Sequence, residues 1–198
     1  MPLIALVGMP GGGKSTVGRQ LARRLRWDFA DTDDLIERRI GTSIRQFFEQ
    51  QGEDAFRDVE QSVIADAVAQ RSGVLATGGG AVLRAANRDA LRDGCTVVYL
   101  RSAPEELFRR LRHDMNRPLL QVANPLGRLR DLHAQRGPLY ERTAHFIIET
   151  GRPSIHTLVN MILMQLELAG LIGADAAPSS IGHARQGDGR ADVGRQRR

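Results

Sequence analysis

The residues most suited to chemistry in this sequence form a glycine-rich segment near its beginning. Residues 8–15 read GMPGGGKS, which matches a glycine, four variable residues and Gly-Lys-Ser/Thr. In such a segment the backbone amides turn toward one anion, the lysine reaches the β- and γ-phosphates, and the serine hydroxyl suits Mg²⁺. Lys14 is the only lysine among the 28 Lys and Arg residues, so this position departs from the preference of the chain for arginine. The segment predicts a nucleotide-binding loop.

A second cluster of candidate residues follows a short apolar stretch at 27–30. Asp31 and Asp33 are two residues apart, so both can face one crevice if the backbone stays extended. The apolar stretch at 74–77 ends in glycines without an acidic residue for a metal ion, which makes Asp31 the candidate ligand. Asp33 could then serve a substrate hydroxyl. Helix capping is the alternative for an aspartate-rich turn, and Asp34 suits that role.

Three consecutive glycines and several arginines could bind a second ligand. Gly78–Gly80 would let a small molecule lie against backbone amides, with a loose turn as the alternative. Arg57 precedes Glu60 by three residues, and a salt bridge along one helix is its simpler interpretation. Arg117 and Arg136 lie beside prolines and glycines, as in mobile lids that carry cations to a substrate, although for each arginine taken alone a surface position is favoured over a catalytic one.

The elements that must position these residues alternate between strand and helix. Apolar runs and helical spacing predict strands at 3–7, 27–30, 74–77, 96–100 and 146–149, and helices at about 14–25, 34–40, 43–50, 53–71, 84–92, 104–112, 126–142 and 154–170. Such alternation predicts a five-stranded parallel sheet in a three-layer α/β/α fold. Each candidate cluster falls at the carboxyl end of a strand, where such sheets bind ligands.

Composition and charge limit the class of protein. The chain has 198 residues, 41% hydrophobic and 26% charged, which is ordinary for one globular domain, expected at 1–172. From residue 173 the composition predicts a disordered tail over 173–198. The single cysteine, the missing secretory signal and the lack of a long apolar run favour the cytoplasm and exclude a membrane span. Arginines interspersed with carboxylates argue against nucleic-acid binding despite a net charge of +5.

Six segments in order give the sequence a close resemblance to the shikimate kinase family, within the nucleoside-monophosphate-kinase-like group of P-loop proteins. They are GMPGGGKST (8–16), DTD (31–33), FEQQGEDAFRDVE (48–60), TGGGAV (77–82), RPLL (117–120) and RGPLYER (136–142). The resemblance covers about residues 3–168. It implies the P-loop NTPase fold of that group, a monomer, and ATP- and Mg²⁺-dependent transfer of the γ-phosphoryl group to the 3-hydroxyl of shikimate, in the pathway to chorismate and the aromatic amino acids.

The resemblance also implies a role for each matching residue. The phosphates of ATP would be held by Gly11, Gly12, Gly13, Lys14, Ser15 and Thr16, and the adenine by Arg110 and Pro153. Arg117 would reach the transferred phosphoryl group from a lid at about 112–124. In the shikimate-binding region, about 31–60, Asp33 would bind ring hydroxyls and act as the base. The remaining substrate contacts would be Arg57 and Arg136 on the carboxylate, and Gly78, Gly79, Gly80, Phe48 and Phe56 around the ring. Asp31 would lie near Mg²⁺ through water, with Ser15 as a direct ligand.

Two other functions fit parts of the sequence. A kinase for another small polyol acid, such as gluconate, would share the phosphate loop, but we would not expect the triple glycine together with both arginine segments. A non-catalytic sensor of shikimate-like molecules would be expected to lose Lys14, Asp33 or Arg117, and this chain keeps all three. Both considerations favour shikimate kinase.

Overall fold

The computed structural model of the protein describes residues 2–111, 122–151 and 153–173. Arg117, most of the expected lid and the chain beyond residue 173 lie outside these ranges. The described elements are, in order, β1 (Leu3–Val7), α1 (Lys14–Leu25), β2 (Phe29–Asp31), α2 (Thr32–Ile40), α3 (Ile44–Gln70), β3 (Gly73–Ala76), α4 (Ala85–Gly94), β4 (Thr96–Arg101), α5 (Pro104–Leu111), α6 (Pro125–Thr143), β5 (Phe146–Glu149) and α7 (Ile155–Leu168).

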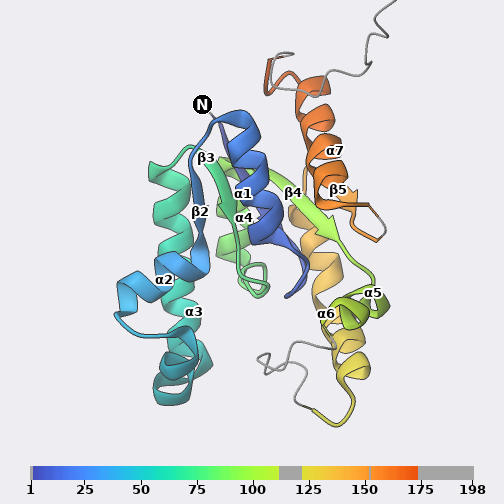
Figure 1. Ribbon diagram of the computed structural model, residues 1–198. Helices are drawn as coiled ribbons and strands as arrows, with labels where there is room; N and C mark the ends of the chain where they lie inside the picture. Colours follow the sequence, from blue (N-terminus) through green and yellow to red (C-terminus); the bar gives the residue numbers. More distant parts are fainter. Residues whose placement is uncertain (1, 112–121, 152, 174–198) are drawn as a thin grey trace, which may run out of the picture.

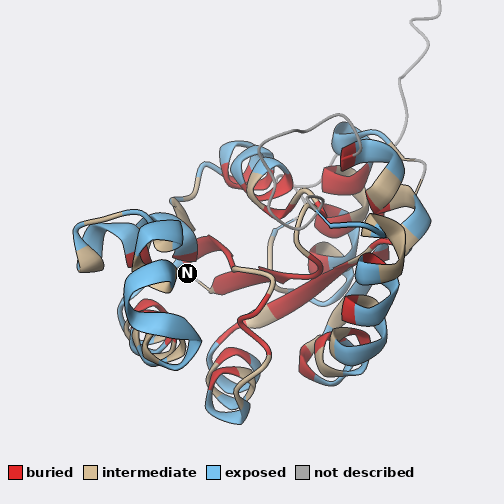
Figure 2. Cartoon of the chain, turned by 90° about the horizontal axis from the view of Figure 1, so that it is seen from below, coloured by how far each residue is buried: buried red, intermediate tan, exposed pale blue. Residues whose placement is uncertain are grey.

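The strands form one parallel sheet in the order β2-β3-β1-β4-β5, between two layers of helices (Figure 1). Side chains of β1 alternate between the two faces. Leu3, Ala5 and Val7 join a core with α3, α4, α5 and α6, whereas Ile4 and Leu6 join a second core with α1 and α7. Seen from below, buried strands lie between helices whose exposed sides face outward (Figure 2). The predicted three-layer fold with a five-stranded parallel sheet is confirmed.

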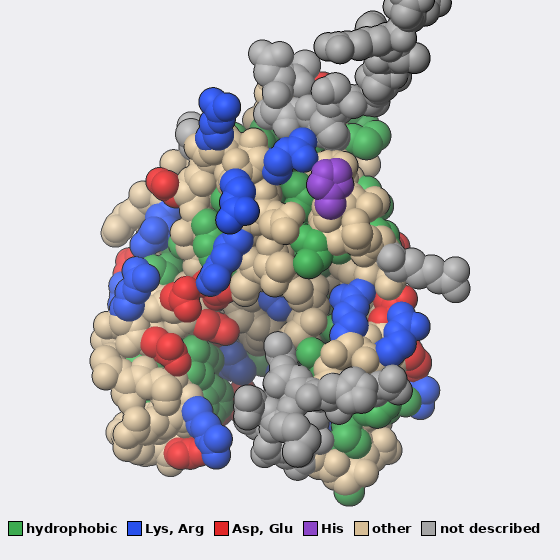
Figure 3. Space-filling view, in the orientation of Figure 1, with side chains coloured by type: hydrophobic (Ala, Val, Ile, Leu, Met, Phe, Trp, Pro, Cys, Tyr) green, Lys and Arg blue, Asp and Glu red, His purple; other side chains and the backbone are tan. Residues whose placement is uncertain are grey.

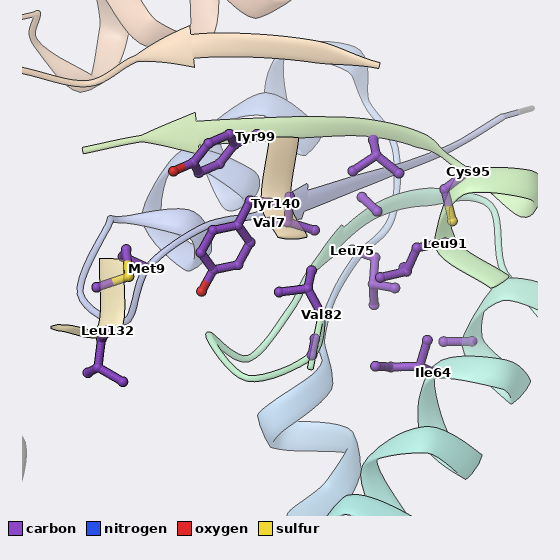
Figure 4. Close-up of a cluster of buried hydrophobic side chains, with 14 of the residues drawn as sticks. Val7, Met9, Ile64, Leu75, Val82, Leu91, Cys95, Tyr99, Leu132 and Tyr140 are labelled. Carbon is purple, nitrogen blue, oxygen red and sulfur yellow. The ribbon is translucent and has the colours of Figure 1, made fainter. Parts of the chain in front are cut away.

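The core on the α3–α6 side contains both tyrosines of the chain (Figure 4). Tyr99 of β4 and Tyr140 of α6 are fully buried, and their ring centroids lie 5.1 Å apart. Cys95, the single cysteine of the chain, is buried in the same core. In the described part of the chain, no helix has the length and apolar character needed to cross a membrane.

Two glycines shape the helical segment beside the sheet. Gly41, with φ at 70°, ends α2 where the sequence predicted a break. At Gly52 the backbone leaves the helical region (φ 81°, ψ 179°), so α3 consists of two helical pieces at an angle. The two helices predicted on either side of Gly52 are therefore confirmed as pieces of one kinked element.

The end of β2 differs from the expectation. The strand runs from Phe29 to Asp31, one residue further than predicted, because Asp31 still pairs with Ala76 of β3. The extended backbone of Asp31 places its side chain over the start of α2, where it accepts a hydrogen bond from the amide of Asp33 at 3.1 Å. The expected cap at Asp34 is thus wrong, because the strand delivers Asp31 to the capping position instead.

Candidate active site

The loop between β1 and α1 forms an anion-binding concavity. Gly8, Gly11 and Gly13 have φ of 149°, 77° and 83°, so the chain can turn sharply before α1 begins at Lys14. Lys14 is 7% exposed, and its Nζ lies 2.9 Å from the carbonyl oxygen of Gly8 and 2.8 Å from that of Met9. The loop therefore holds one cation among backbone amides at a helix N-terminus, the arrangement that binds phosphate.

Ser15 and Asp31, the predicted metal ligands, are brought together. The Ser15 hydroxyl donates a hydrogen bond of 2.6 Å to Oδ2 of the buried Asp31. These oxygens fit Mg²⁺, which prefers hard oxygen ligands and keeps phosphate and water in the rest of its shell. Among the described residues no group of three or more His, Cys, Asp or Glu side chains is placed to hold a metal ion by itself. The pair suits an ion that arrives with a nucleotide.

A cavity of about 820 Å³ opens beside the phosphate loop; we call it the large cavity. Its lining residues come from the start of α2, from α3, from the glycine loop (Gly78–Gly80), from the phosphate loop, and from α6 and the segment before it. They include the predicted substrate residues Asp33, Phe48, Phe56, Arg57, Gly78, Gly79 and Gly80. Figure 3 shows the molecule hollowed between its α2–α3 side and its α5–α6 side. Segments far apart in the sequence thus meet at one site.

Arg57 supplies the buried positive charge of the large cavity. Its side chain is 12% exposed and pairs with Glu60, itself 1% exposed, at 2.6 Å, and with Glu53 at 3.1 Å. Burial acts to lower the pKa of Arg57, but the attraction of Glu60 and the hydrogen bonds to Glu60 and Glu53 outweigh it and raise the pKa. A Cβ added to Gly80 would lie 2.3 Å from the guanidinium, so Gly80 makes room for it. The predicted salt bridge and the predicted cavity position are therefore both present.

Asp33 supplies a carboxylate to the same cavity. Its side chain lines the cavity, and its Oδ1 lies against Gly78, where an added Cβ would be 2.9 Å away. Burial by the surrounding protein, the nearby Asp31 and further carboxylates raise the pKa of Asp33 from 3.8 to about 6, although Lys14 opposes them. Asp33 is therefore ionised at neutral pH, with an affinity for protons well above that of an ordinary aspartate.

Arg136 reaches the glycine loop from helix α6. Its Nη1 donates to the carbonyl oxygen of Gly79 at 3.1 Å, and the hydroxyl of Tyr140 donates to the same oxygen. Arg136 lies within α6, which continues through Pro138 to Thr143, so it belongs to a regular helix and lies outside the lid expected at about 112–124. On its other side, Gly79 lies against Pro10 of the phosphate loop, with an added Cβ 2.6 Å from the proline ring. The glycine loop is thus held between the phosphate loop and α6.

A second cavity, of about 420 Å³, also borders the phosphate loop; we call it the small cavity. It is lined by Gly11, Gly12, Gly13 and Thr16 together with Arg110 of α5 and Pro153, so the two residues expected at the adenine face one space. Arg110 also donates to the carbonyl oxygen of Thr150. Of the predicted ATP residues that the structure describes, all except Lys14 and Ser15 line this one cavity.

Some residues of the site had no role assigned from the sequence. The spacing of Glu60 indicates only a salt-bridge partner along the helix, whereas its near-complete burial follows from packing between α3 and the glycine loop. Tyr140 lies within the segment 136–142, but its residue type and position indicate no function. Arg45, Glu49 and Arg128 line the mouth of the large cavity, and no sequence signal distinguished them from other surface charges.

The fold and the two cavities are those of a small P-loop kinase, with a phosphate loop at the centre and a separate place for an acceptor. The family model described as shikimate kinase matches residues 10–167. The chain is 53% identical to a shikimate kinase of Ralstonia nicotianae over 89% of this chain and 93% of the relative. It is 56% identical to one of Paracidovorax citrulli over 85% and 93%. The chain belongs to the shikimate kinase family, and it is a kinase that phosphorylates a hydroxyl group.

Solved structures agree with this assignment. A shikimate kinase from Acinetobacter baumannii in complex with shikimate superposes with a TM-score of 0.80 at 44% identity, covering 87% of this chain and 96% of that one. One from Aquifex aeolicus gives 0.75 at 32% identity, covering 86% and 99%. A gluconokinase from Sinorhizobium meliloti gives 0.55 at 19% identity, covering 85% and 93%, which is a likeness of fold alone.

Proposed function

We propose that this kinase transfers the γ-phosphoryl group of ATP to the 3-hydroxyl of shikimate bound in the large cavity, through the residues named below. One observation carries the proposal: a buried guanidinium and a carboxylate of raised pKa face the same cavity, beside the phosphate loop. A small acid with ring hydroxyls needs this pair of groups, one for its carboxylate and one for its hydroxyls.

The acceptor is positioned by groups of α3, α6 and the glycine loop. Arg57 binds the shikimate carboxylate, since a guanidinium matches a carboxylate through two parallel hydrogen bonds. Arg136 assists from the other side of the glycine loop. Phe48 and Phe56, with ring centroids 4.5 Å apart, form an apolar wall against the ring of the substrate. Asp33 accepts hydrogen bonds from ring hydroxyls and orients the one that attacks.

The donor is positioned by the phosphate loop and the small cavity. Gly11, Gly12, Gly13 and Thr16 hold the phosphates through their amides, and Arg110 and Pro153 enclose the adenine. Lys14 places positive charge beside the γ-phosphoryl group. Mg²⁺, held by Ser15 and, through water, by Asp31, would supply further neutralisation of the phosphate charge when it is bound with ATP. Arg117, outside the described residues, supplies the last cation.

Phosphoryl transfer of this kind depends mostly on positioning and charge neutralisation, because its transition state is loose. Asp33 therefore has two modest tasks: it fixes the direction of the attacking oxygen, and it receives the proton that this oxygen loses late in the reaction. Its pKa of about 6 suits both, since the group is ionised at neutral pH yet more basic than an ordinary aspartate.

The test is the release of ADP from ATP and Mg²⁺ with shikimate, with gluconate and without an acceptor. We expect release that depends on shikimate and is lost in Arg57→Ala. Arg39→Ala is the matched control, because Arg39 forms an exposed ion pair with Asp66 away from the large cavity. ADP release with gluconate but not with shikimate would mean that gluconate, not shikimate, is the acceptor. ATP binding without ADP release would favour a non-catalytic sensor.

We also propose that the enzyme is a monomer of the cytoplasm. The family resemblance supports the first point, and the single cysteine with the use of ATP supports the second. Light scattering after gel filtration should give a mass near 21.8 kDa. A mass of twice that value would show a dimer and contradict the proposed monomer.

A further inference from the structure

Both tyrosines of the chain lie in one core, but their hydroxyl groups have different surroundings. The rings of Tyr99 and Tyr140 are stacked and fully buried. Among the described residues the Tyr99 hydroxyl has no hydrogen-bond partner, whereas the Tyr140 hydroxyl donates to the carbonyl oxygen of Gly79. Figure 4 shows the two hydroxyl oxygens pointing in different directions. Tyr140 therefore does something at the glycine loop that its neighbour does not.

The carbonyl of Gly79 is held by two donors from consecutive turns of α6. Arg136 and Tyr140 are four residues apart, so they lie on one face of the helix, and both donate to this oxygen. Burial raises the pKa of Tyr140, so its hydroxyl keeps the proton that it donates across the pH range of ordinary assays. The direction of this carbonyl is thereby fixed toward α6.

Fixing the carbonyl also fixes an amide. The carbonyl of Gly79 and the N–H of Gly80 belong to one planar trans peptide, so they point in opposite directions. With the oxygen toward α6, the N–H points away from α6, on a loop that lines the large cavity. In the described part of the chain the amide of Gly78 donates to Thr32 and that of Ala81 to Gly78, whereas no partner is found for the amides of Gly79 and Gly80. Two adjacent N–H groups are thus left for a ligand oxygen.

We infer that Tyr140 is a positioning residue for the acceptor: with Arg136 it anchors the Gly79 carbonyl, which orients the Gly80 amide and the Arg136 guanidinium for an anionic substrate. The inference rests on the proposed acceptor site. Tyr140 does not contact the substrate itself. Because the anchored groups act on the bound acceptor before and during transfer alike, loss of the anchor raises the acceptor KM and leaves kcat nearly unchanged.

The chain offers a matched pair of variants. Tyr140→Phe removes the anchoring hydroxyl and keeps the ring, and Tyr99→Phe removes an unpartnered hydroxyl from the stacked ring. We expect Tyr140→Phe to raise KM for shikimate about fivefold, the effect of one buried hydrogen bond, with KM for ATP and kcat within about twofold. Tyr99→Phe should leave all three constants unchanged. An unchanged shikimate KM in Tyr140→Phe, or an equal rise in both variants, overturns the inference.

A second measurement keeps both tyrosine hydroxyls in place and covers the case in which Tyr140→Phe folds poorly. Since the chain has only two tyrosines, protein labelled with 3-fluorotyrosine gives two fluorine resonances, which Tyr99→Phe assigns. Saturating shikimate should shift the Tyr140 resonance more than the Tyr99 resonance. No shift at Tyr140 overturns the inference. A wild-type enzyme that ignores shikimate in the ADP assay would instead refute the acceptor site, before any variant is made.

Discussion

Replacing Glu60 with leucine should destabilise the fold by about 3 kcal/mol. Glu60 is 1% exposed, and its carboxylate is 2.6 Å from Arg57, which is 12% exposed. Removing one partner of a buried ion pair costs roughly 3–5 kcal/mol, because the other charge stays buried without compensation. The lower value applies here, since Arg57 keeps Glu53 at 3.1 Å. For a chain of this length the melting temperature should fall by about 6–12 °C.

The assay is urea unfolding followed by the fluorescence of Trp27, the single tryptophan of the chain. Glu53→Leu is the matched control: it removes the other partner of Arg57, but Glu53 is 61% exposed, so the loss should be under about 1 kcal/mol. Replacing both buried charges, Arg57→Met with Glu60→Leu, should recover most of the stability while leaving the enzyme inactive with shikimate. If Glu60→Leu is no more destabilising than Glu53→Leu, the reasoning from burial is wrong.

A pH profile and four further variants test separate features of the site and the fold. Because the pKa of Asp33 is about 6, kcat/KM of the wild-type enzyme should fall about tenfold per pH unit below pH 6. Asp33→Asn should lose about a hundredfold or more in kcat, and its kcat/KM should not show this acidic decrease; the same decrease in both proteins would contradict the assignment. Lys14→Ala should be inactive. Gly80→Ala should raise KM for shikimate more than KM for ATP, because its Cβ would occupy the place of the Arg57 guanidinium; steady-state kinetics with each substrate varied will show whether the two constants separate. Gly52→Ala should destabilise the protein by about 1–3 kcal/mol, because φ 81° with ψ 179° is nearly restricted to glycine; urea unfolding that matches wild type would mean that the kink relaxes without cost.

The fold was predictable from the sequence because its signals are local. The apolar run Leu3–Val7 followed by glycines and Lys14 indicates a buried strand, a phosphate loop and a helix, and the structure has all three. Gly41 and Gly52 marked helix boundaries through their own backbone freedom. The cap of α2 was missed because it depends on where β2 stops, and that point is set by pairing with β3, a contact between distant residues.

The candidate site was predictable only as far as its motifs reached. Asp33 and Gly78–Gly80 stood out by type and spacing, Arg57 was assigned to the site only by the family resemblance, and all of them meet at the large cavity. The burial of Glu60 and the anchoring contact of Tyr140 arise from packing between α3, the glycine loop and α6. No pattern along the chain encodes such contacts, because their partners lie on different elements; Tyr140 and Gly79, for example, are 61 residues apart.

The pairing of β1 with β3 has a consequence for changing the acceptor. Leu6 is level with Ala76, so the phosphate loop and the glycine loop begin side by side, and Gly79 touches Pro10. The distance between donor and acceptor is therefore built into the register of two central strands, where a slip of one residue would displace a loop by about 3.3 Å. The α3 wall carries no such constraint. Specificity for new acceptors should therefore be sought by redesigning the α3 wall, while the phosphate loop and the glycine loop are left unchanged to keep the distance between donor and acceptor.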